Sequence, residues 1–446
     1  MYFNEYLTSL IDTYGLSKNK LIKDTCIDRS SFFQFLKGSR KPTGKQLSKI
    51  AYAAGLKDEE NRLLHELYVK DKYGEKTCHS WQTIRKMIGK LDSMTFGKPK
   101  DTPIYRYMKD VCTAKGETAA SVHFDLFLSI RTYLEADISN VLASLPEVFP
   151  GRITVQVIIV DFSDQEISDT ELTEHFMRNI PLHIIPRLEF RSHYYPEVYQ
   201  RTKLPLIGYP FFILSDNSLL LINDMNNSCK YMEDADFQHQ YSSSFEEFMK
   251  KCPPLSQQSI GLQDYSKALE SMLQYSDDNL VYTVEYRPCV FSIAPMDLVI
   301  KYAPAELQEI AQPYVSVFQS SLHLKEYFTP EGFEDFRNDG IVYEAGPNVH
   351  LTKPDTESIC SLMLDEIGKT RFFLNSSRLA ASQTWSIASG RKALIFATNI
   401  KESISVISLN PQICSAFYDY FSHLDADGAE MLPEAAFRRL SEPITE

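Results

Sequence analysis

Residues 26–43 read CIDRSSFFQFLKGSRKPT and combine three phenylalanines with four basic side chains. Asp28 is a favoured N-cap residue, and Phe32 and Phe35 follow it at helical spacing. Gly38 is the kind of residue that ends a helix. The stretch therefore predicts one short helix with a buried aromatic face and a basic outer face.

Similar signals predict four further helices around this one. Residues 3–14 carry apolar side chains at intervals of three and four. Ser17 is a good N-cap for a second helix, and only Thr25 to Ile27 separate that helix from the third. A fourth helix is expected to end at Gly55, and a fifth to begin at Asp58. The second and third helices thus have helix-turn-helix geometry, in which the later helix enters the DNA major groove.

Residues 16–56, LSKNKLIKDTCIDRSSFFQFLKGSRKPTGKQLSKIAYAAGL, resemble the Xre, or Cro-like, helix-turn-helix family of bacterial and phage repressors. The resemblance rests on the caps, the apolar positions, the Gly-x-x-x-Pro ending and the helix LSKIAYAAGL. It implies an all-α, five-helix DNA-binding domain over residues 1–72. Two positions depart from the family pattern: Cys26 stands where glycine is common, and Ile22 where alanine is common. A non-glycine residue in that turn costs about 1 kcal/mol if its φ is positive.

The outer side of the third helix carries side chains suited to reading base edges. Arginine pairs with guanine, glutamine with adenine, and an exposed aromatic ring contacts the thymine methyl group. The predicted readers on this helix are Arg29, Ser30, Phe33 and Gln34. The family resemblance adds Lys18, at the start of the second helix. The competing interpretation is a solvated basic face with Phe33 in the core.

A second set of side chains suits the phosphate backbone, which sets register rather than sequence preference. These are Ser17, Lys37, Ser39, Arg40 and Lys41. Residues 1–100 hold 19 Lys and Arg against 11 Asp and Glu, a net charge of +8. The whole chain carries −13, so the remainder carries −21. This asymmetry is typical of a basic nucleic-acid-binding module on an acidic body.

Residues 73–115 predict a helical connector. Trp81 lies on an amphipathic helix there, whose apolar face either packs within the chain or forms a dimer seam. A loop or hinge is expected over residues 95–103, TFGKPKDTP.

The remaining chain predicts an α/β body with mixed sheets in two lobes, 116–258 and 259–446. A long helix or helix pair is expected over 116–145, and a long helix over about 303–326. Each lobe then repeats a hairpin, and later a helix with Phe-x-x-[Phe/Tyr]. The pattern favours a two-fold internal repeat, and ordinary α/β alternation is the alternative. The order of elements is also loosely similar to the degenerate phospholipase-D-like lobes of some bacterial regulators.

Motifs for catalysis are weak. The one H-x-K sequence, His323 to Lys325, is followed by Pro330 where a phospholipase-D-like enzyme needs aspartate. No phosphate-binding glycine loop, nucleophile elbow or H-E-x-x-H motif occurs. The segment from Arg187 to Lys203 mixes basic and aromatic side chains, which suits either an effector pocket or a loop of internally paired arginines. We therefore expect no enzymatic activity, metal or cofactor.

The expected function is sequence-specific transcription regulation in the cytoplasm. Eight cysteines without metal-binding spacing and the lack of an apolar run of about 18 residues favour that compartment, with no membrane partner. The expected partners are a double-stranded DNA operator, a second copy in a homodimer, and an unidentified small-molecule or protein effector. The alternatives are a DNA-binding protein whose body is a cryptic enzyme, or an antitoxin-like protein-interaction module.

Overall fold

The structure is a computed structural model of the 446-residue chain. It describes residues 1–89, 96–116, 119–160, 169–195, 209–223, 228–260, 280–303, 323–342, 348–376, 379, 383–390, 394–397 and 404–441. The chain forms two compact units. The first holds Met1–Lys90, Leu262–Ser403 and Ser415–Glu446, and the second holds Leu91–Gly261 and Ile404–Cys414.

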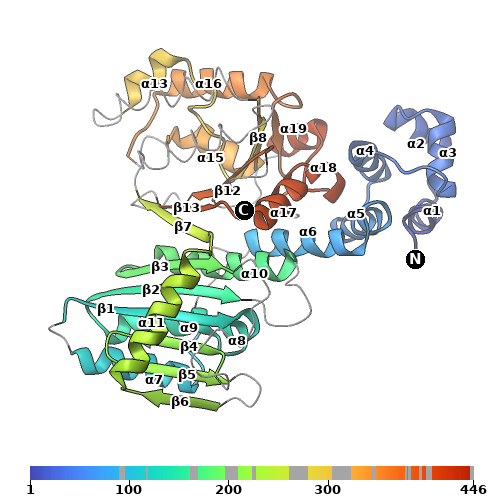
Figure 1. The fold of residues 1–446 in the computed structure, drawn as a ribbon. Coiled ribbons are helices and arrows are strands. Elements are labelled where there is room, and N and C mark those ends of the chain that lie inside the picture. Colours follow the sequence, from blue (N-terminus) through green and yellow to red (C-terminus); the bar gives the residue numbers. More distant parts are fainter. Residues whose placement is uncertain are drawn as a thin grey trace. The chain divides into compact units, whose positions relative to one another are not determined.

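The first 89 residues of the first unit are helical (Figure 1). The helices are α1 (Phe3–Thr13), α2 (Lys18–Thr25), α3 (Arg29–Lys37), α4 (Gly44–Ala54), α5 (Asp58–Tyr73) and α6 (Glu75–Ile88). Ser17 and Asp28 cap α2 and α3 as predicted, because each side-chain oxygen accepts a backbone N–H in the first turn. Gly38 ends α3 with φ +73°, a left-handed conformation that favours glycine.

The core of these helices is aromatic. Phe32 and Phe35 are fully buried, and the rings of Phe3 and Tyr68 pack edge to face at 5.5 Å. The Tyr68 hydroxyl donates to the carbonyl of Pro42 at 2.8 Å, which ties α5 to the loop between α3 and α4. The loop that follows α3 is therefore held by the core.

An α/β lobe completes the first unit. Its strands are β8 (Leu280–Glu285), β9 (His323–Phe328), β10 (Arg371–Phe373), β11 (Thr384–Ala388) and β12 (Leu394–Ala397), in the sheet order β10-β9-β8-β11-β12. Its helices are α13 (Met296–Tyr302), α15 (Pro330–Asp339), α16 (Lys353–Asp365), α18 (Leu424–Asp427), α19 (Pro433–Ser441) and, from Ser415 on, α17 (Pro411–Phe421).

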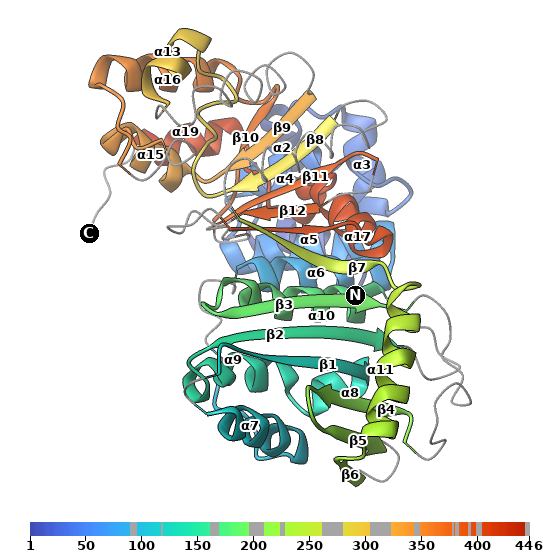
Figure 2. The ribbon, with the colours of Figure 1, turned by 60° about the vertical axis from the view of Figure 1, so that its left-hand side comes forward.

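The second unit is a second α/β lobe. Its strands are β1 (Ser121–Ser129), β2 (Arg152–Val160), β3 (Leu188–Tyr194), β4 (Phe211–Ser215), β5 (Leu219–Asn223), β6 (Ser228–Met232), β7 (Pro254–Ile260) and β13 (Ile404–Ser408). Its helices are α7 (Pro103–Lys115), α8 (Ile130–Glu135), α9 (Ile138–Val148), α10 (Asp169–Asn179), α11 (Ala235–Met249) and the 3-10 helix η2 (Ile180–Ile184). The strands follow the order β13-β7-β3-β2-β1-β4-β5-β6 (Figure 2).

The two lobes share one strand topology. In the second unit, β1, β2 and β3 are parallel, and β4 and β5 continue the sheet antiparallel on the other side of β1. In the first unit, β8, β9 and β10 are parallel, and β11 and β12 continue antiparallel on the other side of β8. Along the chain, one more strand and an aromatic-rich helix follow in each case, β6 with α11 and β13 with α17, and β13 itself belongs to the sheet of the second unit. This shared order supports the predicted internal repeat.

Both helices expected ahead of the hairpins need correction. Residues 121–129 form β1, and only α8 and α9 are helical in the predicted stretch 116–145. Val122, Phe124 and Leu126 are buried on alternate positions, a period of two that a helical interpretation overlooks. Of the helix expected over 303–326, residues 304–322 lie outside the described residues, and His323–Phe328 is strand β9. Parallel pairing on both sides of β9 explains its extended conformation.

Candidate nucleic-acid interface

Helices α2 and α3 are joined by the short segment from Cys26 to Asp28. Asp28 accepts the backbone N–H of Ser31 at 2.8 Å. Hydrogen bonding by Ser31, through its side chain and its backbone N–H, lowers the pKa of the Asp28 carboxyl, and the charge of Arg40 acts in the same direction. Asp28 is therefore ionised at neutral pH, where its charge favours the N-terminus of α3.

The outer face of α3 carries four of the five predicted base-reading side chains, and the fifth, Lys18, begins α2. Arg29, Ser30 and Gln34 are exposed, whereas Phe33 and Lys18 are half-buried. The Arg29 guanidinium lies 5.7 Å from the centre of the Phe33 ring, a cation–π distance. The Phe33 ring therefore packs beside Arg29 and limits the directions in which the Arg29 side chain can extend.

Four of the five predicted phosphate-binding residues are exposed around this face, namely Ser17, Lys37, Ser39 and Arg40. Arg40 donates to the Ser31 hydroxyl at 2.9 Å, which holds its guanidinium close to α3. Lys41 differs, because it is half-buried and forms an ion pair with Asp71 of α5. A phosphate contact by Lys41 would have to displace that carboxylate.

Cys26 adopts the left-handed conformation at the end of α2, with φ +55° and ψ +28°. Glycine is common at this turn position in the helix-turn-helix family that the sequence resembles, and this chain has cysteine there. The Cβ atom of an L-residue in this conformation crowds the following carbonyl oxygen. The turn is therefore strained.

Replacing Cys26 with glycine should raise the free energy of unfolding by about 1 kcal/mol, because glycine adopts this conformation without a steric cost. Cys26→Ala is the matched control, since it removes the thiol and keeps the Cβ atom. Urea unfolding followed by circular dichroism measures both variants. An equal gain in the alanine variant would assign the effect to the thiol.

The contacts that attach the N-terminal helices to the rest of the first unit were not predicted from the sequence. In the first unit, α4 and α5 pack against α18, more than 350 positions away along the chain. His65 of α5 hydrogen-bonds the carbonyl of Ala426 at 2.9 Å. The α carbon of Gly44 lies so close to this segment that a Cβ atom there would stand 2.5 Å from the backbone nitrogen of Ala426. Lys45 lies 3.5 Å from Glu430, whose pKa is raised by burial.

Helix α6 continues this attachment. Trp81 is buried, donates from Nε1 to Asp419 at 2.9 Å and stacks on the ring of His423. Ile84 and Ile88 of the same face are also buried. Of the two interpretations of this apolar face, packing within the chain is therefore the one the structure supports.

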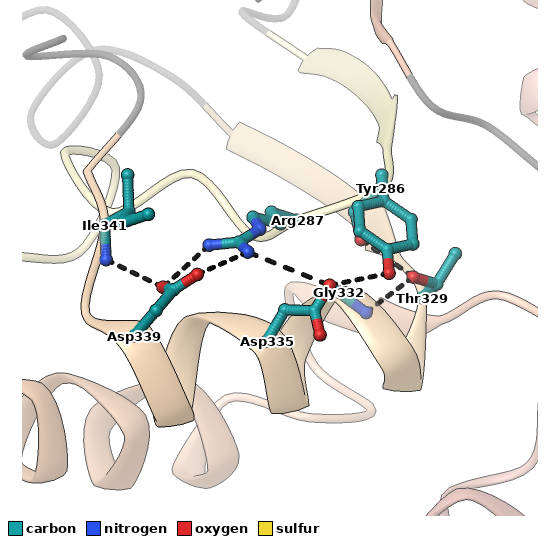
Figure 3. Close-up of polar contacts among 7 residues, drawn as sticks. All are labelled: Tyr286, Arg287, Thr329, Gly332, Asp335, Asp339 and Ile341. Carbon is teal, nitrogen blue, oxygen red and sulfur yellow. Dashed lines mark hydrogen bonds and ion pairs between the residues drawn. The ribbon is translucent and has the colours of Figure 1, made fainter. Parts of the chain in front are cut away.

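The α/β lobe of the first unit has a polar cluster at the carboxyl ends of its parallel strands (Figure 3). Arg287, after β8, binds Asp339 through two hydrogen bonds of 2.9 and 2.6 Å and lies 3.7 Å from Asp335. The neighbouring Tyr286 hydroxyl donates to Asp335 at 2.8 Å. Burial raises the pKa of that hydroxyl to about 12.

These groups satisfy one another and leave little polar capacity for a substrate. The backbone N–H of Ile341 also donates to Asp339, at 2.9 Å. At the other end of α15, Thr329 caps the helix and donates to the carbonyl of Tyr286 at 2.9 Å. The cluster therefore braces α15 against the end of β8.

The predicted basic and aromatic segment is only partly described. Arg201 and Lys203 lie outside the described residues. Arg191 pairs with Glu189 at 2.5 Å, and Arg187 donates to the backbone carbonyls of Pro146 and Pro150. These pairings match the interpretation of this segment as a loop of internally paired arginines rather than as an effector pocket.

His323 and Lys325 of the isolated H-x-K sequence lie on β9, and Lys325 stands 5.4 Å from the ring of Tyr282. In the part of the chain that the structure describes, no three His, Cys, Asp or Glu side chains gather as a metal ion would require. Within the same residues, no helix has the length and apolar character needed to cross a membrane. A scan of the chain against protein-family models finds no match, and a search of curated proteins finds no significant similarity.

Proposed function

We propose that this protein is a sequence-specific DNA-binding transcription regulator. Helices α2 and α3 form its helix-turn-helix, and α3 enters the major groove. The α/β lobes form a sensor or assembly body. In this proposal the protein acts as a homodimer on an inverted repeat, because two-fold symmetry of the protein matches two-fold symmetry of an operator.

The observation that carries the proposal is the two-sided character of α3. Phe32 and Phe35 are buried in the helical core, which leaves Arg29, Ser30 and Gln34 exposed on the outer side. Arginine and glutamine are the side chains that read guanine and adenine through paired hydrogen bonds. An exposed face of this composition suits base recognition.

The distribution of charge also supports DNA binding by this surface. Among the described residues, Lys18, Arg29 and Lys37 form no ion pair with a carboxylate, so no acidic side chain neutralises their charges. Residues 1–100 carry a net charge of +8 in a chain of net charge −13. Phosphate contacts by such residues release counterions, so the affinity for DNA should fall steeply with salt.

Selection of bound sequences from random DNA with the full-length protein tests the proposal. A single enriched motif with two-fold symmetry is the expected result, because each protomer would read one half-site. Recovery of no enriched motif, together with no salt-dependent binding to the pool, would refute it.

Arg29→Ala should weaken binding to the best selected site by about 1–3 kcal/mol and relax the preference at one base pair. Lys37→Ala should instead weaken all sequences alike and reduce the slope of log affinity against log salt by about one unit. Lys76→Ala is the matched control, since this exposed lysine lies on α6. Fluorescence anisotropy at several salt concentrations measures all three, and equal effects of Arg29→Ala on every sequence would assign Arg29 to the backbone.

A further inference from the structure

The second unit contains a cavity of about 690 Å³ between α7 and the strands β4 to β6. Its volume lies within the roughly 300–1,000 Å³ range of small-molecule sites. Successive turns of α7 form one wall, with Tyr107, Asp110, Val111 and Ala114. The opposite wall includes Leu220 and Tyr231.

Hydroxyl groups form the floor and bond to one another. The Tyr107 hydroxyl donates to the carbonyl of Ser218 at 2.9 Å and lies 3.1 Å from the Ser215 and Ser218 hydroxyls. All three residues are buried. The hydroxyl groups of the floor are therefore already hydrogen-bonded to one another. The side chains of the walls then determine which ligand the cavity prefers.

The charged side chains of the walls are not balanced. Arg106 pairs with Asp101 at 3.3 Å and Lys115 with Asp216 at 2.6 Å, and neither aspartate lines the cavity. Both cations of the lining thus have an acidic partner that lies outside the lining. Asp110 and Glu233 also line the cavity and, among the described residues, pair with no cation.

Tyr231 brings the aromatic and acidic features together. Its side chain is 54% exposed, and its ring lies 6.0 Å from that of Tyr107 in an edge-to-face arrangement. Its hydroxyl donates to Glu233. That hydrogen bond raises the pKa of Tyr231, and the negative charge of Asp110, which lines the same cavity, acts in the same direction.

We propose that this cavity binds an organic cation, with an ammonium or delocalised positive charge held by Asp110, Glu233 and the face of Tyr231. Aromatic rings attract cations through the negative charge of their faces, and the 54% exposure of Tyr231 leaves its ring open to a ligand. Val111, Ala114 and Leu220 contact the apolar part of the ligand. This site would give the proposed regulator a small-molecule ligand. Binding of that ligand can be measured on the protein without DNA.

Isothermal titration calorimetry of the full-length protein with tetraphenylphosphonium and tetraphenylborate tests the charge preference, because the two ions match in size and shape. Saturable binding of the cation, at least tenfold tighter than the anion, is expected. The double variant Asp110→Asn/Glu233→Gln should lose at least tenfold in cation affinity. Glu135→Gln/Glu246→Gln changes the net charge equally, at exposed positions outside the cavity, and should bind like the unmodified protein.

Tyr231→Phe should retain the affinity for tetraphenylphosphonium, and Tyr231→Leu should lower it severalfold, because the aromatic face is the proposed contact. Equal binding of both ions would overturn the proposal, as would an unchanged affinity in Asp110→Asn/Glu233→Gln. Both readouts use the protein without DNA. A failure here leaves the DNA-binding proposal standing, and loss of DNA binding in Arg29→Ala leaves this site standing.

Discussion

Arg85→Ala should lower the free energy of unfolding of the first unit by about 3–5 kcal/mol, because it leaves a buried carboxylate without its cation. Arg85 of α6 binds Asp427 of α18 at 2.5 Å and Glu66 of α5 at 3.2 Å. The Asp427 side chain is only 4% exposed, so water cannot replace the lost partner. A hydrogen bond from the Tyr420 hydroxyl to Asp427, at 3.1 Å, does not neutralise the charge.

Chemical unfolding of the full-length protein measures this loss. Lys86→Ala is the matched control, since it removes the exposed neighbouring charge on the same helix and should change stability by less than about 0.5 kcal/mol. The double variant Arg85→Met/Asp427→Leu should recover most of the stability, because it removes both charges together. Similar losses in Arg85→Ala and Lys86→Ala would contradict the assigned role of the buried ion pair.

Gly332→Ala should destabilise the α/β lobe of the first unit by about 3 kcal/mol, through overpacking at a site where backbone meets backbone. A Cβ atom at this position in the first turn of α15 would stand 1.9 Å from the carbonyl oxygen of Tyr286. That carbonyl already accepts the backbone N–H of Thr329 at 3.1 Å and its hydroxyl at 2.9 Å. Relief of the clash would require α15 to move away from the end of β8.

The matched control is Gly97→Ala, where an added Cβ atom meets nothing closer than 3.8 Å. Thermal unfolding should show a lower midpoint for Gly332→Ala and little change for the control. Loss of the brace should also expose Arg287 and Asp339, so Arg287→Ala should add little to Gly332→Ala in a double-mutant cycle. Full additivity of the two losses in stability would show that the effect of Gly332→Ala is independent of the contacts of Arg287.

The N-terminal helices were predictable because their signals are local. Ser17 and Asp28 each cap a helix within three residues of themselves, and Gly38 supplies the left-handed residue that ends α3. The burial of Phe32 and Phe35 follows from helical periodicity once these ends are known. The sequence left the φ of Cys26 open, because only the resemblance to a family with glycine at this turn raised the question, and the structure gives a value of +55°.

The error over β1 has a physical cause. The alternation of apolar and polar side chains in this segment extends only from Ser121 to Leu126, and the apolar run from Leu126 to Leu128 then interrupts the period of two. Its parallel partner β2 lies beyond α8 and α9 in the sequence, and no local signal reports that pairing. The hairpins β4–β5 and β11–β12 were predicted correctly, because antiparallel partners are adjacent in sequence.

By itself, the sequence determined the helix ends, the face of α3 that is buried and the positive charge on the opposite, outer face of α3. All of these depend on residues within one or two helical turns of one another. Only the tertiary structure decided that Lys41 is already paired with Asp71, that Arg85 meets Asp427, and that a cavity opens beside Tyr231. Arg85 and Asp427 are 342 positions apart. Contacts at that separation depend on how the sheets and helices pack. The composition or periodicity of one segment cannot predict them.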